Sequence, residues 1–301
     1  MGKLSRQTKE TIKTIVVLLI VAILIAAYVI YPLNKAKTMF AREDVDTTFS
    51  IDSLPPNEIG AYEDSLLVVD TFRIEADGLT SLACLEIHPQ AIDSIKGTVV
   101  IIPEKSYTRE NYIDQVKMIS SEGYSVIIFD PRATGRTSGK YFGFGISEAA
   151  DLEELLSSLF IRTEIVKPLT VIGYGFGADA ALIASSEEER IDKIVLINPY
   201  LTTDRALDRL AQAFDSYTFP FYKTIIFWWY KIRSGFAPQY IEDDAVTPVS
   251  KNTLLLVRES ELDNETVQSF ISNAPKELLT QMTVSDDTAD LNEKVLKFIQ
   301  K

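Results

Sequence analysis

Five residues of this chain, Gly173–Gly177, have the spacing of a sharp turn that presents one side chain for chemistry. They read Gly-Tyr-Gly-Phe-Gly and lie between a predicted buried strand, residues 168–172, and a predicted alanine-rich helix, residues 178–185. In a strand–turn–helix segment of the form G-x-S-x-G, the central serine is a nucleophile. The central residue here is Gly175, which has no side chain to attack a carbonyl carbon. The sequence therefore predicts that the turn is kept and that its nucleophile is missing.

Few other residues could support acid–base or nucleophilic chemistry. His88 is the only histidine, and it ends a predicted strand just before Pro89. Cys84 is the only cysteine, so no internal disulfide can form. We expect Cys84 to be buried in the same strand, where a thiol is a poor nucleophile. No cofactor and no metal site are predicted.

The charge of the chain is distributed unevenly. The formal net charge is −13, and the first 40 residues carry six Lys/Arg and one acid. They contribute +5, which leaves −18 for residues 41–301. Because so acidic a segment repels phosphate groups, we exclude nucleic-acid binding from the expected functions and do not expect binding to anionic lipid.

Residues 15–33 are almost wholly apolar, and about 20 such residues span a bilayer as a helix. A cleavable signal peptide is the alternative, but no small-x-small cleavage site follows the run. We therefore predict a basic tail at 1–13, a transmembrane anchor at 14–33 and an acidic polar tether at 34–60. Basic residues precede the anchor, so the positive-inside rule places the N-terminus in the cytoplasm and residues 61–301 on the other side.

From residue 61 the hydrophobic pattern alternates between strands and helices. Two strands joined by an Asp77-Gly78 turn come first, and buried apolar runs then alternate with amphipathic helices. This order predicts an α/β domain with a mostly parallel sheet and helices on both faces. The predicted strands are 66–75, 80–87, 98–102, 125–129, 169–172, 193–197, 253–257 and 279–284, and the predicted helices are 112–122, 147–159, 178–185 and 290–299.

A long insertion, at about residues 199–250, separates two of these strands. It contains the aromatic stretch 219–230, which reads FPFYKTIIFWWY. We interpret the insertion as a cap on the domain 61–301. Three roles for the stretch remain open: packing on the core, a lid over an apolar pocket, or a patch that touches the bilayer, where Trp and Tyr prefer to lie.

Three stretches, in this order along the chain, resemble the α/β-hydrolase superfamily, in particular its serine aminopeptidase/lysophospholipase-like branch. Residues 129–139 (FDPRATGRTSG) are similar to the D-x-R-G-x-G-x-S-x-G turn of that branch, with Ala133 in place of one glycine. Residues 171–177 match the nucleophile elbow, and residues 290–299 match the final helix. The resemblance covers about residues 65–300 and implies an α/β-hydrolase fold.

The resemblance also implies a triad of serine, histidine and acid. The nucleophile position is Gly175. The acid position, after the second-to-last predicted strand, is Glu261 or Asp263. The histidine position, after the last predicted strand, is Asp286 or Asp287, so no imidazole is present there. Because loss of one member of such a unit can cost about 10⁶ in rate, we expect no catalytic residue at this site.

The oxyanion hole implied by the resemblance is altered as well. The family usually has His-Gly after the strand that corresponds to 98–102, whereas this chain has Pro103-Glu104. A carboxylate at Glu104 would oppose a developing oxyanion, although the backbone N–H of Phe176 is kept. We therefore predict Glu104, Tyr174 and Phe176 as pocket residues that bind a ligand.

Gly173, Gly175 and Ala178 also fit the dinucleotide fingerprint G-x-G-x-x-G/A. That fingerprint usually opens the first strand–helix–strand unit, and an acid ends the next strand. Here it falls in the middle of the chain, and the next strand ends in Leu-Ile-Asn-Pro. Nucleotide binding is therefore disfavoured.

We predict a membrane-anchored α/β-hydrolase-like protein that is catalytically inactive. It would bind a small acyl-type or peptide-like ligand, or a membrane protein partner. One alternative is an active hydrolase of the esterase, lipase or peptidase type with a displaced nucleophile, for example Ser138 or Ser285. A purely structural subunit of an assembly is a third possibility.

Overall fold

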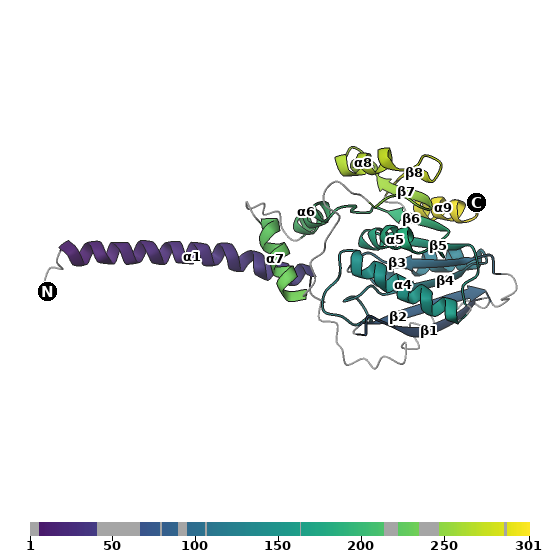
Figure 1. The fold of residues 1–301 in the computed structure, drawn as a ribbon, viewed down its shortest axis with the longest axis horizontal. Coiled ribbons are helices and arrows are strands. Elements are labelled where there is room, and N and C mark those ends of the chain that lie inside the picture. The colour runs from purple at the N-terminus through teal and green to yellow at the C-terminus, as the bar shows by residue number, and fades with distance from the viewer. Residues whose placement is uncertain are drawn as a thin grey trace. The chain divides into compact units, whose positions relative to one another are not determined.

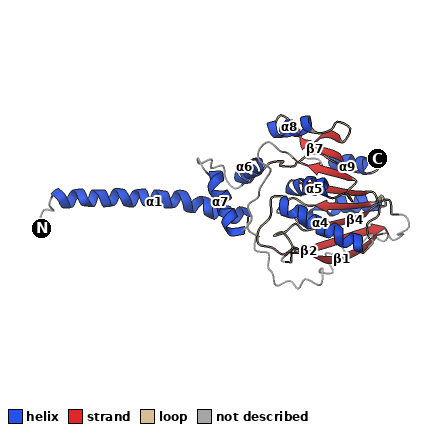
Figure 2. Cartoon of the chain, viewed as in Figure 1, coloured by secondary structure: helices blue, strands red, loops and turns tan. Residues whose placement is uncertain are grey.

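The computed structural model describes residues 6–40, 67–78, 80–89, 95–105, 107–162, 164–213, 222–234, 247–285 and 288–301. The chain divides into two compact units, which are considered separately. Figure 2 distinguishes the helices, in blue, from the strands, in red. The smaller unit comprises Met1–Phe40 and Leu210–Ala237. The larger unit comprises Ala41–Arg209 and Pro238–Lys301.

The larger unit is built on an eight-stranded sheet in the order β1-β2-β4-β3-β5-β6-β7-β8 (Figure 1). β1 pairs with β2, and β2 with β4, in antiparallel register, whereas all later pairs are parallel. The strands are β1 (Leu67–Ala76), β2 (Thr80–Pro89), β3 (Thr98–Ile102), β4 (Ser125–Phe129), β5 (Leu169–Tyr174), β6 (Lys193–Ile197), β7 (Asn252–Arg258) and β8 (Leu279–Val284).

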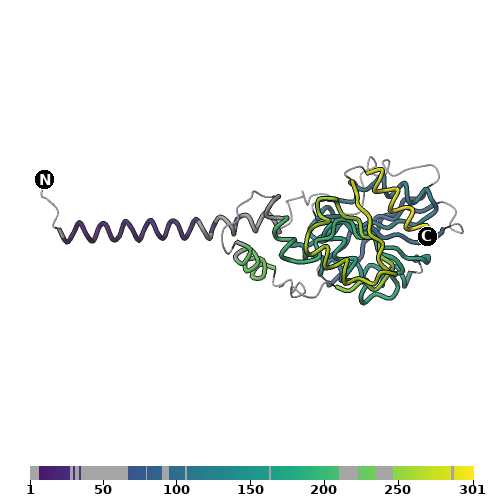
Figure 3. Tube along the Cα trace, turned by 90° about the horizontal axis from the view of Figure 1, so that it is seen from above, coloured from purple at the N-terminus to yellow at the C-terminus, as the bar shows by residue number. Residues whose placement is uncertain are grey.

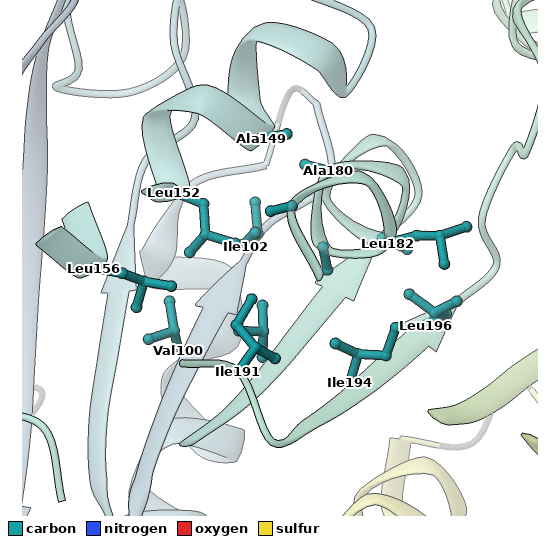
Figure 4. Close-up of a cluster of buried hydrophobic side chains, with 14 of the residues drawn as sticks. Val100, Ile102, Ala149, Leu152, Leu156, Ala180, Leu182, Ile191, Ile194 and Leu196 are labelled. Carbon is teal, nitrogen blue, oxygen red and sulfur yellow. The ribbon is translucent and has the colours of Figure 1, made fainter. Parts of the chain in front are cut away.

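Helices cover both faces of this sheet. α4 (Ile146–Ile161), α5 (Phe176–Glu187) and α8 (Glu265–Asn273) contribute to one hydrophobic core, and α3 (Ile113–Ser121) and α9 (Thr288–Ile299) contribute to the other. Figure 4 shows side chains of β3, β6, α4 and α5 that meet in the first core. β3 and β4 are buried at all of their positions because both of their faces are covered, which is why their sequences, TVVII and SVIIF, do not alternate.

The predicted fold class and the predicted strands and helices of the larger unit are confirmed. α8 was missed, because only Val267 and Phe270 of its nine residues are buried and the apolar period is short. Its start does carry a local signal, since the side chain of Asn264 accepts hydrogen bonds from the backbone of Thr266 and Val267. Two short 3₁₀ turns, Arg109–Tyr112 and Glu259–Glu261, were also not predicted.

The smaller unit contains α1 (Arg6–Phe40) and α7 (Tyr222–Ser234), which contact each other. Residues 7–27 of α1 are apolar enough, and the helix is long enough, to cross a membrane. Figure 3 shows the first part of α1 as an unbroken purple helix. α1 extends beyond the predicted anchor, 14–33, so parts of the expected tail and tether are helical, because extending an existing helix adds a hydrogen bond for each residue fixed. The bounds of the anchor itself stay a prediction.

Part of the expected cap insertion is helical. It contains α6 (Thr203–Ala213) and α7, and its remaining residues at 214–221 and 235–246 lie outside the described residues. The rest of the expected tether, residues 41–60, lies outside them too. α7 falls within the same compact unit as α1, so the described part of the aromatic stretch, residues 222–230, is placed with the N-terminal helix.

Candidate functional site

The site predicted from the sequence lies where β3 and β5 end side by side. Ile102 at the end of β3 is the register partner of Gly173 in β5. Glu104 and Gly175 each come two residues after this pair, in the loops that follow the two neighbouring strands. β3 also has β4 on its other side, so the order of the strands reverses here, and ligands of open α/β sheets bind at such a point.

The turn between β5 and α5 has the geometry of an elbow. Gly175 has φ +50° and ψ −113°, in the region that favours glycine. Its N–H donates to the carbonyl oxygen of Ile197 in β6 at 2.9 Å. A Cβ atom at Gly177 would lie 2.3 Å from the carbonyl oxygen of Ile102, so the outer glycine of the motif lets helix and strand approach closely.

The space directly above Gly175 is filled by the carboxyl group of Glu104. A Cβ atom built on Gly175 would lie 1.2 Å from Oε2 of Glu104 and 2.3 Å from its carboxyl carbon. A serine at position 175 would therefore require the Glu104 side chain to move. Glycine is favoured here by its backbone conformation, and a larger residue also has to displace the end of the Glu104 side chain.

Glu104 also accepts hydrogen bonds from the backbone groups that correspond to the oxyanion-hole donors of α/β hydrolases. In α/β hydrolases these donors are the N–H after the nucleophile and an N–H from the loop after β3. Here the N–H of Lys105 donates to Oε1 of Glu104 at 2.8 Å, and the N–H of Phe176 also donates to this carboxylate. The hydroxyl group of Tyr200 makes a further hydrogen bond with Glu104. The carboxyl group of Glu104 thus engages both of these backbone donors.

The surroundings of Glu104 favour its neutral form. Burial raises the pKa of this carboxyl group to about 8, and the negative charge of Asp179 adds to the effect. The hydrogen bonds from Lys105 and Phe176 and the charge of Lys105 oppose the shift without cancelling it. Glu104 is therefore predominantly protonated at neutral pH, when it can donate a hydrogen bond as well as accept one.

Aromatic rings surround the elbow. The ring of Phe176 contacts Phe142 at 5.0 Å between centroids and Tyr200 at 4.3 Å, and Phe144 lies edge-on to it. The side chain of Phe176 is thus buried, and only its N–H faces Glu104. The Nζ atom of Lys105 lies 5.0 Å from the centre of the Phe142 ring, where its charge favours the ring face.

Tyr174, the third predicted pocket residue, is held by its neighbours. Its hydroxyl group donates to Oε1 of Gln115 at 2.6 Å, and its ring lies 4.6 Å from that of Tyr112. The hydroxyl oxygen of Tyr112 accepts a hydrogen bond from the backbone N–H of Glu104 at 3.2 Å. These contacts fix the segment that carries Glu104.

Asp179 in the first turn of α5 shapes the other side of the site. Its carboxylate accepts hydrogen bonds from the N–H groups of Leu201 at 2.9 Å and Tyr200 at 3.2 Å. Leu201 has φ +67°, which is an uncommon conformation for a branched residue. Asp179 therefore holds the loop after β6 in the position that brings Tyr200 to Glu104.

The carboxylate at the predicted acid position is used in ion pairs. Glu261 bonds Arg205 at 2.6 Å and also bonds Arg209, both on α6. Partial burial opposes ionisation, but the hydrogen bond from Arg205 and the charges of both arginines lower the pKa of Glu261. Arg205 also donates to the carbonyl oxygen of Tyr200, so Glu261 supports the loop of the site indirectly.

The other candidates are placed as follows. Asp263, the second candidate for the acid position, is exposed just before α8. Asp286 and Asp287, at the predicted histidine position, lie outside the described residues. Within the described ranges, no three His, Cys, Asp or Glu side chains are grouped so as to hold a metal ion.

His88 and Cys84 lie away from the elbow. β2 runs antiparallel to β4, and its register pairs Ile87 with Val126 at the start of β4. His88 therefore lies at the opposite end of the sheet from the elbow, which follows the end of β5. Cys84 is buried, and burial raises the pKa of its thiol.

The two serines considered as displaced nucleophiles lie in loops beside strands that are distant from β5. Oγ of Ser138 accepts a hydrogen bond from the N–H of Ser81 in β2 at 2.7 Å, and Ser285 follows β8 and bonds Asp290 at 3.3 Å. β2 and β8 are each three strand spacings from β5, which is roughly 14 Å across the sheet.

The turn that resembles D-x-R-G-x-G-x-S-x-G is a buried structural element. The carboxylate of Asp130 accepts hydrogen bonds from the N–H groups of Arg109 at 3.0 Å and Arg136 at 2.9 Å. Ala133 has φ +58°, so it keeps the conformation that a glycine would adopt more easily. Arg132 forms a two-point ion pair with Asp151, at 2.8 Å and 2.6 Å.

Tyr200, Tyr112 and Asp179 were not predicted as site residues. A signal for Tyr200 exists in the sequence, because it lies just beyond the end of a strand next to β5. Tyr112 and Asp179 act through backbone N–H groups, and residue spacing does not reveal such contacts.

Comparison with known proteins supports an assignment of the fold and goes no further. No family model matches the chain, and no curated protein matches it. An esterase of Pyrococcus furiosus superposes with a TM-score of 0.61 at 21% identity, covering 86% of this chain and 98% of its own. An esterase from Exiguobacterium antarcticum gives 0.56 at 16% identity, with 77% and 100% covered, and a serine hydrolase without a lid from Xanthomonas campestris gives 0.53 at 14%, with 77% and 94% covered.

The chain has the α/β-hydrolase fold. The strand order and the elbow after β5 agree with this, and the resemblance stated from the sequence is confirmed at the level of the fold. At these identities the α/β-hydrolase structures establish the architecture and nothing about substrate. The assignment to a serine aminopeptidase/lysophospholipase-like branch stays a prediction.

Proposed function

We propose that this chain is a membrane-anchored, non-catalytic α/β-hydrolase-like protein that binds a ligand or a membrane protein partner. The observation that carries the proposal is the position of Glu104. Its carboxylate fills the space above Gly175 and engages the N–H groups of Lys105 and Phe176. This position supports a site without a nucleophile at residue 175 and without a free oxyanion donor at these two groups.

The same geometry favours a small ligand with an acyl oxygen, such as a carboxylic acid or a peptide. The hole already accepts an acyl-type oxygen, namely that of Glu104. The carboxyl group is the end of a flexible side chain, so it can turn away and leave its donors to a ligand carbonyl or carboxylate. The oxygen of such a ligand would replace the carboxyl oxygen of Glu104 as the acceptor for the two N–H groups.

The anchor of the proposed protein is α1. In our proposal the N-terminus is cytoplasmic and residues 61–301 are extracytoplasmic, because basic residues concentrate before the apolar stretch. The alternative function is an active hydrolase of the esterase, lipase or peptidase type, because the solved structures that share this fold include esterases. The positions of Ser138 and Ser285, three strands from the elbow, give an unconventional nucleophile little support.

Hydrolysis of a panel of activated acyl esters and aminoacyl amides tests the proposal. The full chain in detergent is compared with Glu104→Gln, Glu104→Gly and a no-protein blank, and Glu277→Gln serves as a matched control at an exposed glutamate. We expect no rate above the blank for any protein. A rate that saturates with substrate, survives further purification and is lost in Glu104→Gln would refute the non-catalytic function.

Binding is measured on the same proteins by thermal shift with carboxylic acids of increasing chain length and with short peptides. Glu104→Gly vacates the hole, so it should bind carboxylates more tightly than the Glu277→Gln control. Equal affinity in the two variants would show that the hole is not the ligand site.

A further inference from the structure

The smaller unit presents an apolar surface that the described elements leave exposed. On α7, the side chains of Trp228 and Ile232 are 64% and 66% exposed, and they lie one helical turn apart on one face. Ile226 and Tyr230, also one turn apart, are 0% and 2% exposed. The two pairs are offset by two residues, or about 200° around a helix. α7 therefore has a packed apolar face and an opposite exposed one.

The charges of α7 differ from those of the rest of the chain. Tyr222–Ser234 contains Lys223, Lys231 and Arg233 and no acid, whereas residues 41–301 together carry −18. Lys231 and Arg233 are exposed beside Trp228 and Ile232. An exposed Trp and Ile flanked by basic side chains is the composition of a helix that lies in the interface of a bilayer with anionic lipids.

The neighbour of α7 supplies the second observation. α7 contacts α1, the helix whose residues 7–27 are long and apolar enough to span a membrane, and Figure 1 shows α7 beside the end of α1 that is nearer Phe40. A helix packed against this part of α1 lies beyond the candidate span and on the side of one bilayer surface. Tryptophan side chains concentrate at such surfaces.

We propose that α7 is an interfacial helix, with Trp228 and Ile232 inserted among lipid headgroups and Lys231 and Arg233 facing anionic phosphates. The inference rests on the anchoring of α1 in the proposed function. α7 would then hold the smaller unit against the bilayer. The acidic charge of the chain as a whole does not oppose this, because charges beyond a Debye length of about 8 Å are screened.

Tryptophan fluorescence tests the proposal directly, because Trp228 and Trp229 are the only tryptophans of the chain. The full chain is reconstituted into lipid nanodiscs as Trp229→Phe, which leaves Trp228 as the only reporter, and as Trp228→Phe, which leaves the less exposed Trp229. Lipids brominated near the headgroup, lipids brominated at mid-chain, and aqueous iodide serve as quenchers. We expect headgroup-brominated lipid to quench Trp228 most strongly and to quench it more than Trp229.

The basic residues are tested by Lys231→Gln with Arg233→Gln in the Trp229→Phe background. Each basic residue near an anionic surface favours binding about fivefold, so the pair should weaken interfacial binding about 25-fold in anionic nanodiscs. Quenching of Trp228 by brominated lipid should be lost at a lower salt concentration in this variant than in Trp229→Phe alone. Lys276→Gln, at an exposed lysine of the larger unit, is the control and should change nothing.

Two results would overturn the interfacial helix. Trp228 quenched by iodide and not by brominated lipid would place it in water. Trp228 shielded from both quenchers would place a protein surface over it. Carbonate extraction of the same membranes separates this failure from failure of the anchor. A chain that carbonate extracts would refute both the membrane anchor and the interfacial role of α7. A chain that stays in the membrane while lipid does not quench Trp228 would refute the interfacial role of α7 alone.

Discussion

Replacement of Glu104 by glutamine is expected to change how stability depends on pH. The folded state raises the pKa of Glu104 from 4.5 to about 8, mainly through burial, so the folded state holds this proton more tightly than the unfolded state. The stabilising effect of the proton is fully present below pH 4.5 and is lost as the pH rises through about 8. Glutamine keeps the shape and the acceptor oxygen for Phe176 and does not titrate.

The magnitude follows from the shift. One proton changes stability by up to about 1.4 kcal/mol per pH unit within the window between the two pKa values. Because Glu104 retains some exposure to solvent, we expect about half of the full effect, or roughly 2 kcal/mol between pH 5 and pH 8. The wild type should lose this much relative to Glu104→Gln. Asp130 and Glu148, whose pKa values burial also raises, are shared by both proteins and cancel in the difference.

The assay is urea unfolding of the full chain in detergent, followed by far-UV circular dichroism at fixed ionic strength. Tryptophan fluorescence is unsuitable, because both tryptophans lie in α7 and report on the smaller unit. Glu277→Gln should give a curve parallel to that of the wild type. If Glu104→Gln is also parallel to the wild type, Glu104 is not the buried, proton-binding group described here.

Three further substitutions test the packing around the site. Gly175→Ala should cost about 2–4 kcal/mol of stability, because its Cβ meets Glu104 and a non-glycine residue is strained at φ +50°. This cost should be smaller when the substitution is made in a Glu104→Gly background, as a double-mutant cycle would measure. Simple additivity of the two substitutions would count against the clash. Asp151→Asn should cost about 3–5 kcal/mol by leaving Arg132 without its buried partner, and a loss below about 1 kcal/mol in denaturant titration would contradict this. Ala133→Gly should raise stability by about 0.5 kcal/mol through relief of φ +58°, and a lowered melting temperature would be the opposite result.

The sequence predicted those parts of the fold that local pattern determines. β3, β4 and β6 are short apolar runs bounded by Gly, Pro or Asp residues, and such runs are typical of buried strands. The Asp77-Gly78 turn and the elbow at Gly175 follow from glycine placed where φ is positive. α8 and the full length of α1 were less well predicted, because their ends depend on weak local preferences.

The site could be predicted only in part, for a physical reason. The sequence placed Glu104 near the elbow, but only the register of Ile102 with Gly173 brings its carboxyl group over Gly175. The role of Tyr200 depends on Asp179, which holds the loop after β6 through backbone hydrogen bonds. Likewise, contact between α7 and α1 joins segments almost two hundred residues apart, and no periodicity records such a pairing.

The absence of a reactive nucleophile is tested most directly by intact-mass spectrometry. The full chain is incubated at neutral pH with a fluorophosphonate and, separately, with an activated acyl ester, and its mass is compared with that of the untreated protein. We expect an unchanged mass under native conditions, because Gly175 offers no nucleophile and the carboxyl group of Glu104 is predominantly neutral. A single stoichiometric adduct that disappears on prior denaturation, mapped to Ser138, Ser285 or Glu104, would contradict the non-catalytic function.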